Sequence, residues 1–114
     1  MREDLPIFTL WYGVVGTLLE RVARFPRTLR PVLGGRILER ALDVQKHVLR
    51  LRFSRRRDGL FSAANLDLDE LRILVRLAFE RRLFSSVQYA ELAEAMETCG
   101  RMLGGWERSE EKPA

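Results

Sequence analysis

The stretch LRILVRLAFERRLF, residues 71–84, carries apolar side chains at helical spacing, and they fall on almost every side of the predicted helix. A helix of this kind is typically buried on most sides. Arg72 and Arg76 interrupt it four residues apart and therefore share one face. Because arginine stays charged and an unpaired buried charge is costly, each needs a partner. The candidates are local ion pairs with Asp69 and Glu80, or else a subunit seam, a central channel or a docking surface.

Three further segments show helical periodicity, and no segment alternates between apolar and polar residues as a strand does. Pro26 ends the first helix, the turn at Asp58-Gly59 separates the second from the third, and Gly104-Gly105 stops the fourth. Short connections favour an all-α, antiparallel up-down-up-down four-helix bundle. The expected helices cover approximately residues 5–24, 28–56, 67–83 and 86–104.

We expect one domain over residues 1–107 and a polar, disordered tail over residues 108–114. The second helix carries two apolar stripes, so it should have neighbours on two sides. Together with the apolar third helix, this leads to the hypothesis that the bundle packs against copies of itself. The first stripe is Leu33, Ile37, Ala41, Val44, Val48 and Leu51, and the second is Leu38, Leu42, Leu49 and Phe53.

The composition narrows the classes of function. A single cysteine excludes an internal disulfide framework, and a single histidine beside it excludes the usual zinc spacings, so we expect no metal and no cofactor. The longest uncharged run, residues 5–19, is short for a bilayer span, which predicts a cytoplasmic protein without a membrane partner. No serine has a plausible base beyond His47, and Asp67 and Asp69 fit the start of a helix, so we expect a non-enzyme.

The charge is unevenly spread. The 20 cations exceed the 16 carboxylates, and all cations except Lys46 and Lys112 are arginines, which fork onto phosphate and carboxylate groups. Residues 26–65 hold ten cations against three carboxylates, whereas residues 86–107 hold one against four.

On the second helix, a face with Arg36, Arg40, His47 and Arg50 is either a solvated stripe of ion pairs or a ridge that faces phosphate. The run RFSRRRD, residues 52–58, has the same two interpretations: a soluble loop or a phosphate contact.

Three segments together resemble the Avd family, the accessory variability determinants of diversity-generating retroelements. The resemblance covers roughly residues 8–107, and its most specific parts are L-R-x-L-x-R-L in the third helix and G-R-x-L-G-G-W in the fourth. Four-helix-bundle proteins encoded in ribosomal RNA intervening sequences share the pattern. The segments are FPRTLRPVLGGRILERALDV (25–44), LRILVRLAFERRLFSSVQY (71–89) and GRMLGGW (100–106).

The resemblance implies a barrel-shaped homopentamer that binds nucleic acid and the reverse transcriptase of the element, and so supports error-prone copying of a template RNA into cDNA. Arg72 and Arg76 match positions that matter for that partnership, and Trp106 matches a packing anchor. An RNA-associated protein of the intervening-sequence type and a protein-interaction adaptor are the alternatives. The candidate residues for binding nucleic acid or reverse transcriptase are Arg27, Arg36, Arg40, Arg50, Arg72, Arg76 and Arg101.

Overall fold

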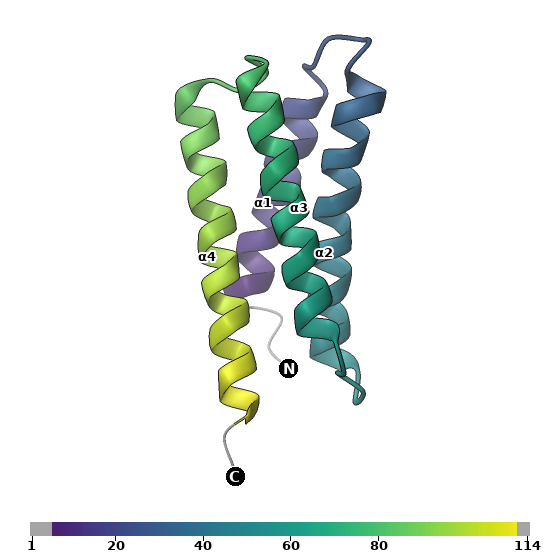
Figure 1. The fold of residues 1–114 in the computed structure, drawn as a ribbon, viewed down its shortest axis with the longest axis vertical. Helices are drawn as coiled ribbons and strands as arrows, with labels where there is room; N and C mark the ends of the chain where they lie inside the picture. The colour runs from purple at the N-terminus through teal and green to yellow at the C-terminus, as the bar shows by residue number, and fades with distance from the viewer. Residues whose placement is uncertain (1–5, 112–114) are drawn as a thin grey trace.

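The computed structural model describes residues 6–111, and these form four helices that run up and down side by side (Figure 1). Each helix packs against the next along the chain, and α4 closes the bundle against α1. The molecule is an elongated rod of 51 × 23 × 23 Å. This confirms the predicted all-α four-helix bundle. The helices are α1 (Pro6–Val22), α2 (Gly35–Phe53), α3 (Leu60–Glu80) and α4 (Ser86–Glu111), and a π-helical turn, η1 (Arg30–Gly34), precedes α2.

The core is apolar, and among the described residues no polar or charged side chain is fully buried. Trp11 of α1 is 1% exposed, and its indole N–H donates to the carbonyl oxygen of Ala41 on α2 at 2.8 Å. This bond satisfies the one polar atom of a large core side chain. Burial raises the pKa of the Cys99 thiol to about 12, so the thiol stays protonated at neutral pH and is not an activated nucleophile.

The start of α3 differs from the prediction. The helix begins at Leu60, directly after Gly59 in the left-handed conformation at φ 74°, rather than near Asp67. Phe61, Ala64 and Leu68 extend its buried stripe by two turns, and this burial outweighs the acidic residues that suggested a helix start.

The start of α2 also differs, because Thr28 does not begin a continuous helix. The chain makes the turn η1 first, and α2 ends at Phe53 instead of Arg56. Gly34 shows why the entry is special: a Cβ atom there would lie 2.6 Å from Cγ1 of Val22. The turn therefore brings the backbone closer to α1 than any residue with a side chain would allow.

The predicted stop at Gly104-Gly105 is wrong, because α4 continues to Glu111. Leu103 is buried, and the ring of Trp106 meets that of Phe61 edge to face, with centroids 5.7 Å apart. Packing thus carries the helix through two glycines that cost about 1 kcal/mol each in a helix interior. Trp106 thus packs against the core, and its importance as an anchor stays a prediction. Of the predicted tail, residues 108–111 are helical, and residues 112–114 lie outside the described part of the chain.

Two apolar stripes are left uncovered by the described residues. On α2, Leu42, Leu49 and Phe53 are exposed, so only the first of its two stripes is buried. On α3, Leu66, Ile73 and Leu77 are exposed, so this helix is not buried on most sides as its composition suggested. Residues 6–111 do not supply the additional neighbours that the sequence predicts for these helices. Within residues 6–111, no helix has the length and apolar character that a bilayer crossing requires.

Candidate nucleic-acid interface

Arg40, in the middle of the predicted basic ridge, is surrounded by carboxylates. Its guanidinium pairs with Asp43, lies 3.5 Å from Glu39 and reaches across to Glu70 of α3 at 3.4 Å. Burial alone would lower the pKa of Arg40, but Glu70 and Asp43 raise it above its ordinary value. A phosphate would have to displace these carboxylates to bind here.

The next residue of the ridge, His47, also faces α3 and not solvent. Its Nε2 lies 2.9 Å from Oδ2 of Asp67, and both side chains are largely buried. At the start of the ridge, Arg36 is exposed and lies 3.9 Å from Glu39. The geometry of Arg36, Arg40 and His47 therefore matches the ion-pair interpretation of this face, and only Arg50 projects freely into solvent.

Arg72 fastens α3 to α4. One guanidinium nitrogen pairs with Asp69 at 2.8 Å, and the other donates to the carbonyl oxygen of Met96 on α4 at 3.2 Å. The guanidinium lies directly over Gly100, where a Cβ atom would come within 2.9 Å of Nη2. Arg72 belongs to the L-R-x-L-x-R-L motif and Gly100 begins the G-R-x-L-G-G-W motif. The two motifs therefore meet in one contact between α3 and α4.

Arg76 makes the local pair that was the simpler of its two interpretations. It bonds Glu80 at 3.2 Å, and its side chain is 71% exposed. Arg101 on α4 does the same with Glu97 at 2.8 Å. These i,i+4 pairs are open to solvent and weak, typically about 0.5 kcal/mol. A direct role for these arginines in binding nucleic acid or a polymerase remains a prediction.

The fold brings a second group of arginines together at the upper end in Figure 1. The buried rings of Phe25 and Phe84 meet edge to face at 5.6 Å and so join the α1–α2 connection to the α3–α4 connection. Arginines that are far apart in sequence thereby lie at one end of the rod. This upper arginine cluster consists of Arg24, Arg27, Arg30, Arg81 and Arg82.

All five members of the upper cluster are exposed, and none has a carboxylate at ion-pair distance within residues 6–111. Arg30 donates to the carbonyl oxygen of Phe25 at 3.1 Å, and Arg81 donates to that of Leu77 at 3.3 Å. The backbone of Arg82 is in the left-handed conformation at φ 63°, which residues other than glycine rarely adopt. Two of these five charges are thus oriented by backbone contacts, and none is paired with a carboxylate of residues 6–111.

The α2–α3 connection forms a basic patch at the opposite end (Figure 1). Arg57 pairs with Glu110 and ties the connection to the end of α4, and the bond from Arg57 lowers the pKa of that carboxyl. No ion-pair partner lies among the described residues for the other arginines of this connection or for the two arginines in the last turn of α2. This lower arginine cluster consists of Arg50, Arg52, Arg55 and Arg56.

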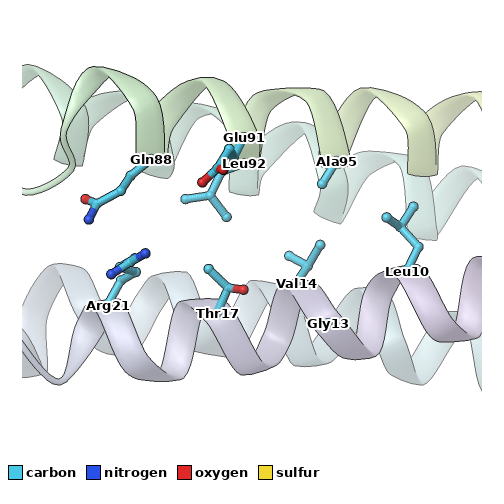
Figure 2. Close-up of a pocket in the computed structure, with 9 residues that line it drawn as sticks. All are labelled: Leu10, Gly13, Val14, Thr17, Arg21, Gln88, Glu91, Leu92 and Ala95. Carbon is cyan, nitrogen blue, oxygen red and sulfur yellow. The ribbon is translucent and has the colours of Figure 1, made fainter.

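A shallow groove of about 410 Å³ lies between α1 and α4 (Figure 2). Its floor is apolar, with Leu10 and Val14 from one helix and Leu92 and Ala95 from the other. At one end the side chain of Arg21 lies opposite Gln88 and Glu91 of α4. The lining contains no nucleophile with a base beside it, so it suggests no reaction.

The predicted site residues therefore separate into two groups. Arg27 belongs to the upper cluster and Arg50 to the lower one, while the other candidates are held by carboxylates along the rod. Sequence reasoning singled out the run at 52–58 but missed the upper cluster. The missed signal is that both connections at that end contain arginines and no carboxylate. Those absent from the candidates were Arg24, Arg30, Arg81 and Arg82 in the upper cluster, and Arg52, Arg55 and Arg56 in the lower one.

Comparison with known proteins gives one match. A model of the family described as bAvd-like matches residues 11–110 of the chain. The matched range runs from the core tryptophan of α1 to the end of α4 and includes both arginine clusters. No curated protein and no solved structure matches.

Proposed function

The chain belongs to the bAvd-like family, and from that premise we propose that it is the non-catalytic accessory subunit of a diversity-generating retroelement. In this role it binds the template RNA or its cDNA, and it binds the reverse transcriptase that makes the copy. In this role it leaves the chemistry to the polymerase and supports the reaction by holding the nucleic acid beside it.

The observation that carries this proposal is the separation between paired and unpaired arginines. Along the rod, Arg40, Arg72 and Arg76 bond carboxylates of the same chain. At the two ends, nine arginines find no carboxylate within the described residues, counting five in the upper cluster and four in the lower. A phosphate that binds at the ends displaces no carboxylate of the described residues. Its binding also releases counterions from the nucleic acid. We therefore assign nucleic-acid binding to the ends.

The exposed apolar stripes support the protein partners in this proposal. Leu42 and Leu49 on α2, with Ile73 on α3, present large apolar side chains to solvent. Large apolar side chains that recur along a helix and stay exposed are a feature of protein interfaces. We propose that copies of the chain cover Leu42, Leu49 and Ile73, but not Phe53 at the end of α2, in a homo-oligomer, the pentamer that the family resemblance implies. Light scattering on the purified protein checks this, and a monomer at micromolar concentration would contradict it.

The test of nucleic-acid binding is RNA affinity across a salt series. Each arginine that contacts one phosphate contributes about 0.7 to the slope of log affinity against log salt for single strands. We expect each end variant to reduce this slope by about 2 and the rod variant to leave it nearly unchanged. The upper-end variant is Arg24→Gln/Arg27→Gln/Arg81→Gln, the lower-end variant is Arg50→Gln/Arg55→Gln/Arg56→Gln, and the rod variant is Arg40→Gln/Arg76→Gln/Arg101→Gln.

Three results would contradict parts of the proposal. If the rod variant loses as much slope as the end variants, phosphate binds along the rod. If the protein binds no RNA even at low salt, it is an adaptor between proteins. If it binds RNA but not the reverse transcriptase encoded beside it, the intervening-sequence type of function becomes the better account.

A further inference from the structure

Phe53 is an aromatic side chain placed where the core does not need it. It is the last residue of α2 and is 72% exposed. Phenylalanine is usually buried, and an exposed one beside charged groups invites a functional explanation. The following residue, Ser54, turns into an extended conformation, so the ring stands at the corner where the helix ends and the α2–α3 connection begins.

The surroundings of the ring are basic. The guanidinium of Arg52 lies 5.1 Å from the ring centroid, which is within cation–π distance. Arg50 precedes the ring by one turn, and Arg55 and Arg56 follow it, all of them exposed. The nearest carboxylate in sequence is Asp58, at the far side of Arg57. An exposed ring among four arginines that have no ion-pair partner within residues 6–111 is the combination that binds unpaired bases together with their phosphates.

Tyr12 gives the contrast within the same molecule. It is 75% exposed, as Phe53 is, but it lies on α1 beside Phe8, Thr9 and Gln45, with no arginine among the residues that line this hollow. The upper cluster gives the opposite contrast, because Phe25 and Phe84 are buried, and the half-buried rings of Phe79 and Tyr89 stack on each other with centroids 4.2 Å apart. Only the lower end joins an exposed aromatic ring to unpaired arginines within residues 6–111.

We propose that the end of α2 is a binding site for single-stranded nucleic acid, in which one unpaired base stacks on Phe53. The phosphates on either side of that base lie on Arg50, Arg55 and Arg56. In a duplex the faces of the bases are covered by their neighbours, so the ring selects single strands. The upper cluster, which has charge but no exposed ring, binds single and double strands alike. This inference rests on the proposed nucleic-acid binding and adds the state of the strand to it.

The test measures the affinity of the full chain for four fluorescent probes of equal length by anisotropy. The probes are a single-stranded RNA, the DNA of the same sequence, an abasic strand with the same backbone, and a duplex. The variants are Phe53→Ala, Phe53→Tyr, which keeps the aromatic face, and Tyr12→Ala as the matched exposed control.

We expect Phe53→Ala to weaken binding of the single strands about tenfold, since stacking of one base contributes on the order of a factor of ten. Binding of the abasic strand and the duplex should stay unchanged, and Phe53→Tyr and Tyr12→Ala should bind as the native chain does. RNA and DNA should lose equally, because stacking does not involve the 2′-hydroxyl.

Several outcomes would overturn the inference. An equal loss for the abasic strand would mean that Phe53 only shapes the connection. No loss for any strand would mean that the arginines act alone. A change of oligomeric mass with Phe53→Ala would place the ring in a seam between copies. If the native chain binds no probe at all, the proposed nucleic-acid function fails, whereas retained binding with an unchanged Phe53→Ala variant removes only this inference.

Discussion

The middle of this bundle and its two ends use the same residue type in different ways. Along the rod, Arg40 is held by three carboxylates and Arg72 by a carboxylate and a backbone carbonyl. At the ends, arginines such as Arg27 and Arg55 are exposed without an ion-pair partner among the described residues. A guanidinium that already has its carboxylate stabilises helix packing, and one without is available to phosphate. The neighbours of an arginine, and not its presence, decide which task it can perform.

The largest expected effect concerns the length of the nucleic acid. The two clusters lie at opposite ends of a 51 Å rod, which corresponds to roughly 15 base pairs at about 3.4 Å each. A strand long enough to reach both ends of one rod should bind about 100-fold more tightly than one that reaches a single end, because the second contact is intramolecular. Anisotropy with strands of increasing length measures this gain. Neutralising either cluster should abolish it, and a gain that persists would show that both contacts lie at one end.

The second prediction disturbs the packing that builds the upper end. Gly34→Ala places a methyl group 2.6 Å from Val22, beside Phe25, so the turn before α2 must move. We expect a loss of about 1–3 kcal/mol in the free energy of unfolding. The matched control is Gly35→Ala, which meets nothing within 4 Å and should stabilise the helix by up to about 1 kcal/mol. Chemical denaturation compares the two, and equal effects would show that Gly34 is not held by that contact.

The third prediction tests whether Arg72 is a fastener between helices. Arg72→Ala removes the bond to the Met96 carbonyl and should cost about 1 kcal/mol of stability. In a Gly100→Ala background, the new methyl group already displaces the Arg72 guanidinium. Adding Arg72→Ala to that background should therefore leave the free energy of unfolding almost unchanged. Denaturation of both single variants and the double variant measures the coupling. Additive effects would show that Arg72 does not act through its contact over Gly100. A fall in the RNA salt slope with Arg72→Ala would show that Arg72 contacts phosphate, as the arginines at the ends are proposed to do.

The smallest expected effect is that of Arg82→Gly, which removes a charge at the upper end without destabilising the fold. The left-handed backbone conformation is strained for Arg82, whereas glycine adopts it without strain. Arg82→Gly should therefore leave the free energy of unfolding equal or raise it by up to about 1 kcal/mol. The same variant should lower the salt slope of RNA binding by about 0.7 if Arg82 contacts one phosphate. Tighter RNA binding by the variant would be inconsistent with the upper cluster as an interface.

The helices were largely predictable because their apolar spacing is a local property of the chain. The errors at the start of α3 and the end of α4 share one cause, which is that packing overrode local signals. Asp67 and Asp69 suggested a helix start, but Phe61 and Ala64 had enough core to extend α3. Gly104-Gly105 suggested a stop, but the contact of Trp106 with Phe61 carried α4 past it.

The sequence by itself determined the fold class, the buried first stripe of α2 and the basic run at 52–58, because each depends on residues within a few positions of one another. It gave the pair of Arg76 with Glu80 only as one of two interpretations. Only the tertiary structure decided that Arg72 bonds α4 over Gly100 and that Glu70 of α3 joins the carboxylates around Arg40. The contact of Phe25 with Phe84 likewise gathers arginines from two distant connections into one cluster. Long-range packing sets these positions, and the charge pattern of a linear chain does not contain them.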